Sequence, residues 1–439
     1  MNNTKEELVV LGRGPLGLFT SYILLKKGYQ VINIDSGIGL NLLRERININ
    51  SNINWMDLQH KPSLNKKASN YEWGGACMGF NPRFKNDDSI VSIDDINESY
   101  SKVAKVLILD NFDFSINKPN TNRHPKDNEK FQYIYAKISK NVFLKQLQKN
   151  IESNANYKFI DNAIATEVHS ENKKQYLKYL EYPSFNSNEI YYSKLFLCLG
   201  TIENTRLLLN SRDYIKINNN QLGGNLTDHI SFKFAEIFLK EYEDISNDFN
   251  YQEEDVNSKI WPRLELTDNS QPASFCYLDF FQKNNQNILN FIKKKNEGSA
   301  NMNLFVEKKK ESESFIDIKK REHVSEINVN FKLSKDEISN YVELISKYIN
   351  FFNENYKNIN IVENKAFLDI KNFSTTNHPS STTIMSKFPE DGVVDKFSRL
   401  WNEKNIYIFG SSVFERAENI HPTFAAMALC HYSLENSLN

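Results

Sequence analysis

The sequence predicts a mixed α/β fold, α+β overall, in which buried parallel strands in the first half of the chain precede a region of antiparallel sheet. Short apolar runs that end at glycine, at residues 8–11 and 195–199, are typical of buried parallel strands that lead into helices. From about residue 231 to 374 apolar and polar residues alternate instead, as in 327–331, which is typical of half-buried strands.

The domain organisation follows from this change of pattern. A chain of 439 residues is longer than one core usually holds and favours about two to three domains. We expect residues 1–230 and 375–439 to form one discontinuous domain, and residues 231–374 to form a second domain that faces the substrate.

The composition limits the partners and the compartment. The 54 basic and 55 acidic residues give a net charge of −1, so we do not expect nucleic acid as a partner. The first seven residues are polar, and no apolar run approaches the roughly 20 residues that span a bilayer. None of the four cysteines is paired at the spacing of metal ligands, so we expect free thiols and no metal site. We expect a cytoplasmic protein without a transmembrane segment.

The first strand runs into a glycine pattern that is typical of dinucleotide binding, Gly12-Arg13-Gly14-Pro15-Leu16-Gly17. Gly12 permits the tight turn, Gly14 lets the backbone approach a pyrophosphate closely, and Gly17 lets the following helix pack against the strand. The N–H groups at the start of that helix then face the phosphates. This pattern predicts a nucleotide site of the Rossmann type.

An acidic residue follows at the expected distance. The predicted second strand, residues 31–34, ends at Asp35, which lies 18 residues after Gly17. At this distance a carboxylate can accept hydrogen bonds from both ribose hydroxyls. The alternative is a glycine-rich turn with a solvent-facing Asp35. The pattern does not separate NAD from FAD, although the negative charge of Asp35 disfavours a 2′-phosphate.

A pair of glycines lies in an irregular segment after this strand. Gly74 and Gly75 interrupt residues 71–78, which do not have the pattern of a strand. Adjacent glycines suit either a backbone pressed against a flat ring or a phosphate, or an ordinary loop turn.

The second junction of a strand and a glycine lies in the middle of the chain. The apolar run 195–199 ends at Gly200, and a helix over 202–209 follows. A second full glycine fingerprint is absent between residues 140 and 230. Because enzymes that bind both a flavin and NAD(P)H usually need two such sites, we expect a flavin that takes its hydride directly from the substrate.

Two helices are predicted from their capping residues. Ser92, with Asp94 and Asp95 close behind, begins a helix that ends at Leu107. The capping box Ser334-Lys335-Asp336-Glu337 begins a helix over residues 338–352.

In order and content these motifs resemble those of the glucose-methanol-choline (GMC) oxidoreductases, which bind FAD and oxidise alcohols. The resemblance implies a Rossmann-like FAD-binding domain and a second, antiparallel-sheet substrate domain. Five segments carry it: residues 12–17 with Asp35; Gly74-Gly75 with Asn81-Pro82-Arg83-Phe84; residues 197–209; Gly223-Gly224-Asn225-Leu226-Thr227-Asp228-His229; and residues 378–429, which include Gly410-Ser411.

In motif detail the resemblance is closest to the sugar-oxidising members of the family. Gly410 stands where many members have an aspartate and where sugar-oxidising members often have glycine. Two positions depart from the usual pattern: Ser381 replaces a common glycine, and His421 stands where the sugar oxidisers usually have asparagine. The segment after Gly75 lacks a histidine, so we expect FAD to be bound non-covalently.

The resemblance also implies which residues carry the chemistry. Alcohol oxidation by a flavin needs hydride transfer to N5 and loss of the hydroxyl proton, and an imidazole of near-neutral pKa is suited to take that proton. His378 matches the position of this base, and His421 matches its hydrogen-bonding partner. Pro422 and Thr423 open a helix whose N-terminus would face the N1/O2 edge of the flavin. His229 is expected to have a structural role instead.

The residues expected to hold the cofactor come from turns and helix N-termini along the whole chain. They are Gly12, Gly14, Pro15, Leu16, Gly17, Asp35, Ser36, Gly74, Gly75, Asn81, Ala165, Gly200, Gly410, Ser411, Pro422 and Thr423.

The sequence therefore predicts an FAD-dependent oxidoreductase that oxidises a CH–OH group of a sugar or another alcohol, with an electron acceptor that the sequence does not identify. Three alternatives stay open at this point. They are a flavin-dependent sugar-nucleotide mutase or epimerase, a non-catalytic FAD-binding relic of the family, and a plain NAD dehydrogenase.

Overall fold

The computed structural model of the chain describes most of its length. The described residues are 7–55, 73–85, 89–109, 111–119, 124–139, 142–171, 174–217, 220–240, 242–250, 252–253, 258–280, 298–310, 313–365 and 369–438.

Parallel strands from three distant parts of the chain form one sheet. Its six strands lie in the order β22-β23-β12-β1-β2-β8, and every neighbouring pair is parallel except β22 and β23. Their bounds are β1 Glu7–Leu11, β2 Gln30–Ile34, β8 Tyr157–Ile160, β12 Lys194–Leu197, β22 Arg399–Leu400 and β23 Glu403–Ile408. The strands expected at 8–11, 31–34 and 195–199 are confirmed, and the carboxyl ends of β1, β2 and β12 meet at one edge.

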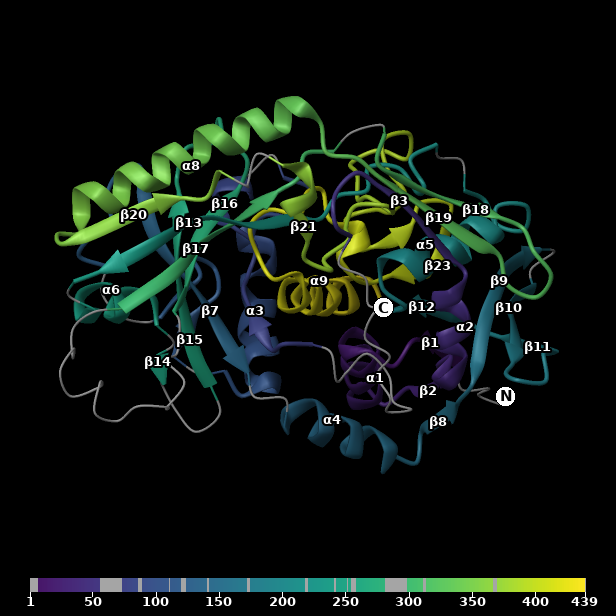
Figure 1. The fold of residues 1–439 in the computed structure, drawn as a ribbon. Coiled ribbons are helices and arrows are strands. Elements are labelled where there is room, and N and C mark those ends of the chain that lie inside the picture. The colour runs from purple at the N-terminus through teal and green to yellow at the C-terminus, as the bar shows by residue number, and fades with distance from the viewer. Residues whose placement is uncertain are drawn as a thin grey trace.

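The last helix of the chain is buried at the centre of the molecule. Helix α9 contacts both α1 and α3 and lies at the boundary between the parallel and the antiparallel sheet (Figure 1). Nearly every side chain of α9 up to Leu434 is buried, so the C-terminal helix belongs to the core. The helices around the parallel sheet are α1 Pro15–Lys26, α2 Leu40–Glu45, α3 Ile93–Leu107, α4 Val142–Glu152, α5 Thr201–Asn210 and α9 Pro422–Ser437.

A nine-stranded antiparallel sheet forms the other half of the molecule. Its main path is β20-β13-β17-β16-β15-β7-β4, with β14 paired to β15 and β21 paired to β13. The bounds are β4 Ala76–Cys77, β7 Phe131–Ser139, β13 His229–Leu239, β14 Gln252–Glu253, β15 Ser258–Leu266, β16 Ser274–Phe280, β17 Gly298–Glu307, β20 Ile359–Glu363 and β21 Ser374–Thr375.

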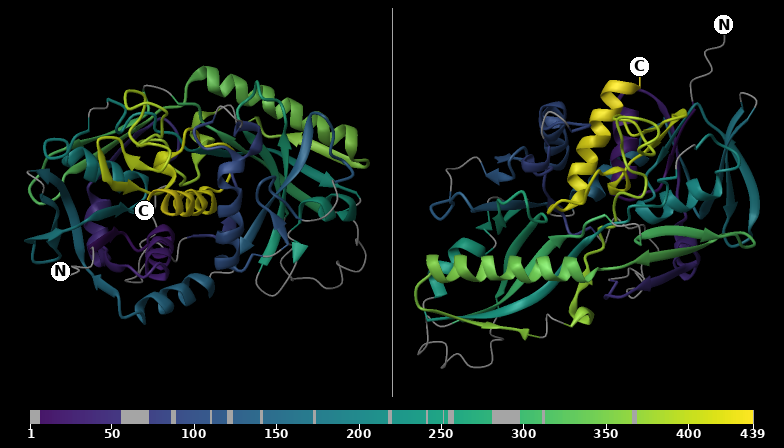
Figure 2. Two further views of the ribbon diagram at one scale, coloured as in Figure 1. Left: turned by 180° about the vertical axis from the view of Figure 1, so that it is seen from behind. Right: turned by 90° about the horizontal axis from the view of Figure 1, so that it is seen from above.

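One face of this sheet is covered by helix α8 (Lys335–Asn355), which runs along the sheet (Figure 2). Aromatic side chains of α8 pack on the strands, with 5.4 Å between the ring centroids of Tyr348 and Phe131. The short helix α6 (Tyr242–Phe249) adds Phe249, whose ring stacks on Phe352. The other face of the sheet is directed toward α9 and therefore carries the residues that can meet a cofactor.

Three smaller sheets complete the fold of the described residues. Strands β18 and β19 form a sheet with β3, and β9, β10 and β11 form another. The bounds are β3 Ile47–Ser51, β5 Phe112–Asp113, β6 Lys118–Pro119, β9 Ala163–Glu171, β10 Lys174–Glu181, β11 Asn186–Tyr191, β18 Phe315–Lys319 and β19 Glu326–Phe331. Short 3₁₀ helices are η1 Gly37–Gly39, η4 Pro82–Phe84, η6 Ile370–Asn372 and η7 Ser411–Val413.

The sheets cross the expected domain boundaries at residues 230 and 374. Strand β7 precedes residue 230 but joins the antiparallel sheet, whereas β18 and β19 lie between the two boundaries but pair with each other and with β3. These strands cross the expected boundaries because they pair with distant segments, and the sequence does not reveal such long-range pairing. The division into two domains stays a prediction.

The two predicted capping boxes are confirmed. At the start of α3, Asp95 N–H donates to Ser92 Oγ, and Ser92 N–H donates to the carboxylate of Asp95. Ser334 and Glu337 make the same reciprocal pair at the start of α8.

The cysteines and the helices agree with the expectations drawn from composition. All four cysteines are buried free thiols. Among the described residues, every helix is too short or too polar to cross a bilayer.

The glycine pair at 74–75 differs from its expected setting. Ala76 and Cys77 form the short strand β4, so the segment is in part a strand, while Tyr71 and Glu72 lie outside the described residues. Gly75 has a φ of +77°, and a Cβ there would lie less than 3.0 Å from the carbonyl oxygen of Ser139. Gly75 is therefore pressed against the backbone of β7, whereas a Cβ on Gly74 would meet nothing within 4 Å.

Replacing Gly75 with alanine is expected to destabilise the protein by about 1–3 kcal/mol or more, because alanine is strained at positive φ and its Cβ would collide with Ser139. Gly74→Ala is the matched control and should change the free energy of unfolding by much less. Urea unfolding of both variants measures this difference. Equal stabilities would contradict the close approach of the two backbones.

Candidate active site

A cavity of about 370 Å³ lies where the carboxyl ends of β1, β2 and β12 meet. Most of the predicted site residues line it, although they come from distant parts of the chain. These are Gly12, Gly14, Pro15, Leu16, Asp35, Ser36, Ala165, Gly200, His378, Gly410, Ser411, Pro422 and Thr423.

The first glycine turn is tightly packed. A Cβ on Gly12, which has a φ of +92°, would lie within 3.0 Å of the backbone of Cys198 on the neighbouring strand. A Cβ on Gly17 would lie within 3.0 Å of the carbonyl oxygen of Gly12, so Gly17 lets α1 begin directly on the strand. Gly14 is the N-cap of α1 and provides no side-chain cap, which leaves the first N–H groups of the helix available to a ligand.

Asp35 is fixed at the rim of the cavity by backbone donors. Its carboxylate accepts hydrogen bonds from the N–H of Arg13 at 2.7 Å and from the N–H of Gly37 at 2.9 Å. Burial raises the pKa of Asp35, and these two hydrogen bonds oppose that rise. The carboxylate is therefore oriented at the edge of the cavity, as a ribose-binding residue requires.

Two glycines leave open space in the cavity wall. Gly200 has a φ of +83° and Gly410 a φ of +134°, and a Cβ at either position would meet no protein atom within 4 Å. Both line the cavity, so side chains there would occupy the space that a flat ligand needs. The residues present therefore fit a dinucleotide that lies along these two turns.

Some predicted cofactor residues do not line the cavity. Gly17, Gly74 and Gly75 are absent from its wall; Gly17 packs on Gly12 and Gly75 packs on β7, as described above. Asn81 is buried in contact with protein groups: its side-chain amide donates to Glu265 and Asn419, and its N–H donates to Glu418. The assignment of these residues to the cofactor stays a prediction. The observed hydrogen bonds indicate that Asn81 has a structural role.

The two predicted catalytic histidines lie together. The ring centroids of His378 and His421 are 5.4 Å apart, with an angle of 85° between the planes. His378 lines the cavity, and His421 lies beside it as the N-cap of α9. Segments 43 residues apart in the chain thus bring two imidazoles together, of which His378 is in the cavity wall and His421 is not.

A third histidine contacts the pair. His229, the first residue of β13, is fully buried, and its Nδ1 lies 3.2 Å from Nδ1 of His378. Its Nε2 lies 3.1 Å from the carbonyl oxygen of Ala417. Asp228 accepts the backbone N–H of His378 at 3.1 Å and the hydroxyl of Thr376 at 3.2 Å. Sequence reasoning gave His229 a structural role and missed Asp228, although both lie in the motif at 223–229.

A buried arginine completes the arrangement. Arg263 on β15 is fully buried, and its Nη2 lies 2.7 Å from Nε2 of His421. Sequence reasoning missed Arg263, because it lies in a strand that carries no family motif.

Burial keeps the histidines uncharged. Burial, with the neighbouring His229 and Arg263, holds the pKa of His378 well below its usual value. Burial and Arg263 do the same for the pKa of His421, and burial lowers the pKa of His229 to about 4. The cluster disfavours an added positive charge on each ring, so the three rings are uncharged and each keeps one nitrogen lone pair.

A metal ion is not the best explanation of this cluster. The ligand atoms of Asp228, His229 and His378 lie within 4.8 Å of one another. However, Asp228 already accepts several N–H groups, and the two Nδ1 atoms are at hydrogen-bonding distance. We interpret the three residues as a hydrogen-bonded network.

The loop that leads into His421 is held by buried polar groups. Glu307 accepts hydrogen bonds from the guanidinium of Arg416 and from the N–H of Glu418. Glu418 accepts the N–H of Asn81 at 2.6 Å through one carboxylate oxygen, while its Oε1 is buried without a hydrogen-bond partner among the described residues. Burial raises the pKa of Glu418 to about 7.

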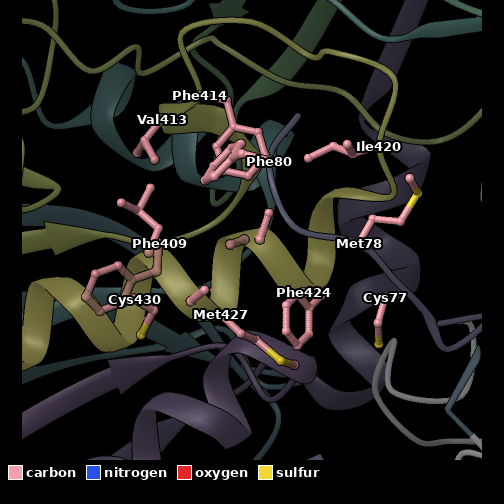
Figure 3. Packing of buried hydrophobic residues seen from close by; sticks show 14 of the residues in the cluster. Cys77, Met78, Phe80, Phe409, Val413, Phe414, Ile420, Phe424, Met427 and Cys430 are labelled. Carbon is pink, nitrogen blue, oxygen red and sulfur yellow. The ribbon is translucent and has the colours of Figure 1, made fainter. Parts of the chain in front are cut away.

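An apolar cluster supports the same loop from the other side. Phe80 and Phe414 meet edge to face, with 4.8 Å between centroids, and Ile420 and Phe424 extend the cluster along α9 (Figure 3). All four side chains are buried. The backbone on both sides of His421 is thus fixed by packing as well as by hydrogen bonds.

Comparison with known proteins identifies part of the chain. Residues 310–430 match the family model described as GMC oxidoreductase, and this stretch includes His378 and His421. No curated protein matches the chain. The match supports the GMC family, whose members generally bind FAD, and it suggests a flavin-dependent oxidoreductase.

Glu418→Gln is expected to remove a pH dependence from the stability of the protein. The folded-state pKa of about 7 lies above the ordinary value of 4.5, so the folded chain binds an extra proton between these values. The free energy of unfolding of the wild type should therefore fall as the pH rises through this window.

Glutamine carries no charge and keeps an acceptor for the N–H of Asn81. The variant should be more stable than the wild type by about 1–3 kcal/mol near pH 8, and the two should converge toward pH 4. Urea unfolding across this range measures the difference. Parallel pH profiles for the two proteins would contradict the buried, protonated state of Glu418.

Proposed function

We propose that this protein is an FAD-dependent oxidoreductase that oxidises a CH–OH group of a sugar or another alcohol, with His378 as the base. The observation that carries this proposal is the contact of His421 with His378, which lines a cavity that the glycine turns and the starts of α1 and α9 also line. The family match supports it, because residues 310–430 contain both histidines. The glycine at position 410, by resemblance, favours a sugar as the substrate.

The residues that would hold FAD follow from the cavity wall. Asp35 would accept the ribose hydroxyls, and the uncapped start of α1 at Gly14 would face the pyrophosphate. Gly200 and Gly410 would leave room for the cofactor. The start of α9 at Pro422 has no side-chain cap, so its positive end would stabilise negative charge on the reduced flavin. When bound, FAD supplies the acceptor of the hydride at N5.

The hydrogen bonds around His378 determine which of its nitrogens can take a proton. The carbonyl of Ala417 can only accept, so Nε2 of His229 carries the proton of that ring. Nδ1 of the uncharged His229 is then an acceptor, and the proton between the two rings belongs to Nδ1 of His378. This leaves the lone pair of His378 on Nε2.

A second contact leads to the same tautomer. The hydroxyl of Thr376 donates its only proton to Asp228, so its oxygen accepts from Nδ1 of His378 at 3.0 Å. Nε2 of His378 is therefore suited to accept the hydroxyl proton of the substrate while the C–H bond breaks and its electron pair leaves with the hydride. Asp228 accepts the backbone N–H of His378, and burial raises its pKa to about 7. In its ionised form Asp228 would stabilise the positive charge that His378 gains.

The cofactor assignment makes a prediction with a matched control. Gly200→Ala should weaken FAD binding by at least about tenfold, or about 1.4 kcal/mol, because its Cβ would enter the cavity. Gly28→Ala is the control, since Gly28 has a φ of +86° and equally open surroundings but lies outside the cavity wall. Titration of the FAD-free proteins with FAD, followed by flavin fluorescence, measures the affinities. Equal affinities would remove Gly200 from the cofactor site.

His378→Ala should leave the protein yellow and slow anaerobic bleaching of the flavin by roughly 10²–10⁴-fold, because the substrate hydroxyl loses its proton acceptor. Free sugars, glycosides and nucleotide sugars are the compounds to screen for bleaching. His323→Ala, a partly exposed histidine outside the cavity wall, is the control and should bleach normally. Unchanged bleaching by His378→Ala, or a product isomeric with its substrate, would contradict the proposed oxidation.

A further inference from the structure

Arg263, on strand β15 of the antiparallel sheet, contacts the histidine pair. Its guanidinium lies 4.0 Å from the ring centroid of Trp261 and 4.6 Å from that of Phe275. Nη1 lies 3.2 Å from Sδ of Met78. Because the side chain is fully buried and contacts two aromatic rings, its donors have a fixed direction.

One of these donors is directed at the second histidine. Nη2 of Arg263 lies 2.7 Å from Nε2 of His421. A guanidinium is charged at every accessible pH and can only donate, so Nε2 of His421 must accept. The proton of the uncharged His421 ring is then on Nδ1.

We propose that Arg263 is a positioning residue that fixes the tautomer of His421, so that His421 offers an N–H to the substrate oxygen while His378 offers a lone pair. The inference rests on the proposed function and deepens it. The family resemblance makes His378 the base and His421 its hydrogen-bonding partner, but it does not say which nitrogen of His421 carries the proton. The contact with His229 gives His378 a free lone pair, and the contact with Arg263 gives His421 a free N–H. An alcohol needs both, because its oxygen loses a proton to an acceptor and then gains negative charge that a donor can stabilise.

The charge of Arg263 acts in the same direction. The charged or titratable groups that face His421 are Arg263 from β15, His378 from the segment after β21, and His229 from β13. Each of them disfavours a second proton on His421. A permanent cation 2.7 Å from Nε2 therefore favours an unprotonated Nε2 and leaves the donor on Nδ1.

The test uses ¹⁵N NMR of the FAD-bound protein labelled at histidine, which reports the tautomer and the titration of each ring without any substrate. The signals of His421 are identified by their absence from His421→Asn. In the wild type we expect a protonated Nδ1 and an unprotonated, hydrogen-bonded Nε2. A protonated Nε2 on His421 would overturn the inference.

Substitution of the arginine gives the second measurement. Arg263→Met keeps apolar contacts with Trp261 and Phe275 but removes the donor and the charge, so the pKa of His421 should rise by about one unit or more and both tautomers should appear. Arg263→Lys keeps the charge and should restore the low pKa. Lys347→Met removes a cation on α8 and should leave the His421 signals unchanged. Identical His421 spectra for Arg263→Met and the wild type would overturn the inference.

Anaerobic bleaching separates a failure of this inference from a failure of the proposed function. Asparagine at position 421 can accept from Arg263 and still donate an N–H, so His421→Asn should bleach at least about tenfold faster than His421→Leu. Equal rates for these two variants would overturn the inference. Bleaching by His378→Ala would instead overturn the proposed function. If His378→Ala is inactive while Arg263→Met bleaches at the wild-type rate, only the role of Arg263 is wrong.

Discussion

The site depends on one constraint, the parallel pairing of β12 with β1 on one side and with β23 on the other. This pairing brings the carboxyl ends of three strands from distant parts of the chain to one edge of a sheet. The glycine turn after β1, Gly200 after β12 and Gly410 after β23 therefore lie in the wall of the same cavity. Helix α9 follows from the last of these strands and packs between α1 and α3 (Figure 1). A packed core thus fixes the position of His421, and no flexible loop is needed to bring it to the site.

Buried polar groups lie where β15 and β17 meet the loop before α9, and hydrogen bonds connect them. Glu265, Glu307 and Glu418 are buried with arginine, asparagine and backbone donors around them. Buried charges are tolerated only when hydrogen bonds replace their lost water, and a network of this kind allows very few arrangements of the backbone. These groups hold the loop at 415–421 in one conformation. Precise placement of His421 is the functional consequence, because its hydrogen bond to Arg263 depends on a fixed backbone.

Local sequence patterns predicted the parallel half of the molecule well, because short-range interactions determine its main features. The strand at 8–11, the turn at 12–17, Asp35 and the capping boxes at Ser92 and Ser334 are each specified by neighbours within a few residues. For the antiparallel half, the sequence predicted an antiparallel sheet but neither the order nor the pairing of its strands. Strands β7 and β15 pair with each other although more than a hundred residues separate them, and β7 lies outside the region where antiparallel strands were expected. Gly75 was read as a candidate cofactor contact because the sequence could not show Ser139 beside it.

The sequence by itself determined the nucleotide-binding turn, the acidic residue that follows it, and the two histidines before prolines, because short-range spacing and residue chemistry encode these features. Only the tertiary structure decided what surrounds the histidines. Different strands and loops bring His229, Asp228 and Arg263 to His378 and His421. None of these contacts can be predicted from residues that are neighbours in the sequence. The physical reason is that a tautomer is set by which donor or acceptor lies within about 3 Å of a ring nitrogen. That distance is fixed by the packing of whole sheets against α9, which no pattern of neighbouring residues contains.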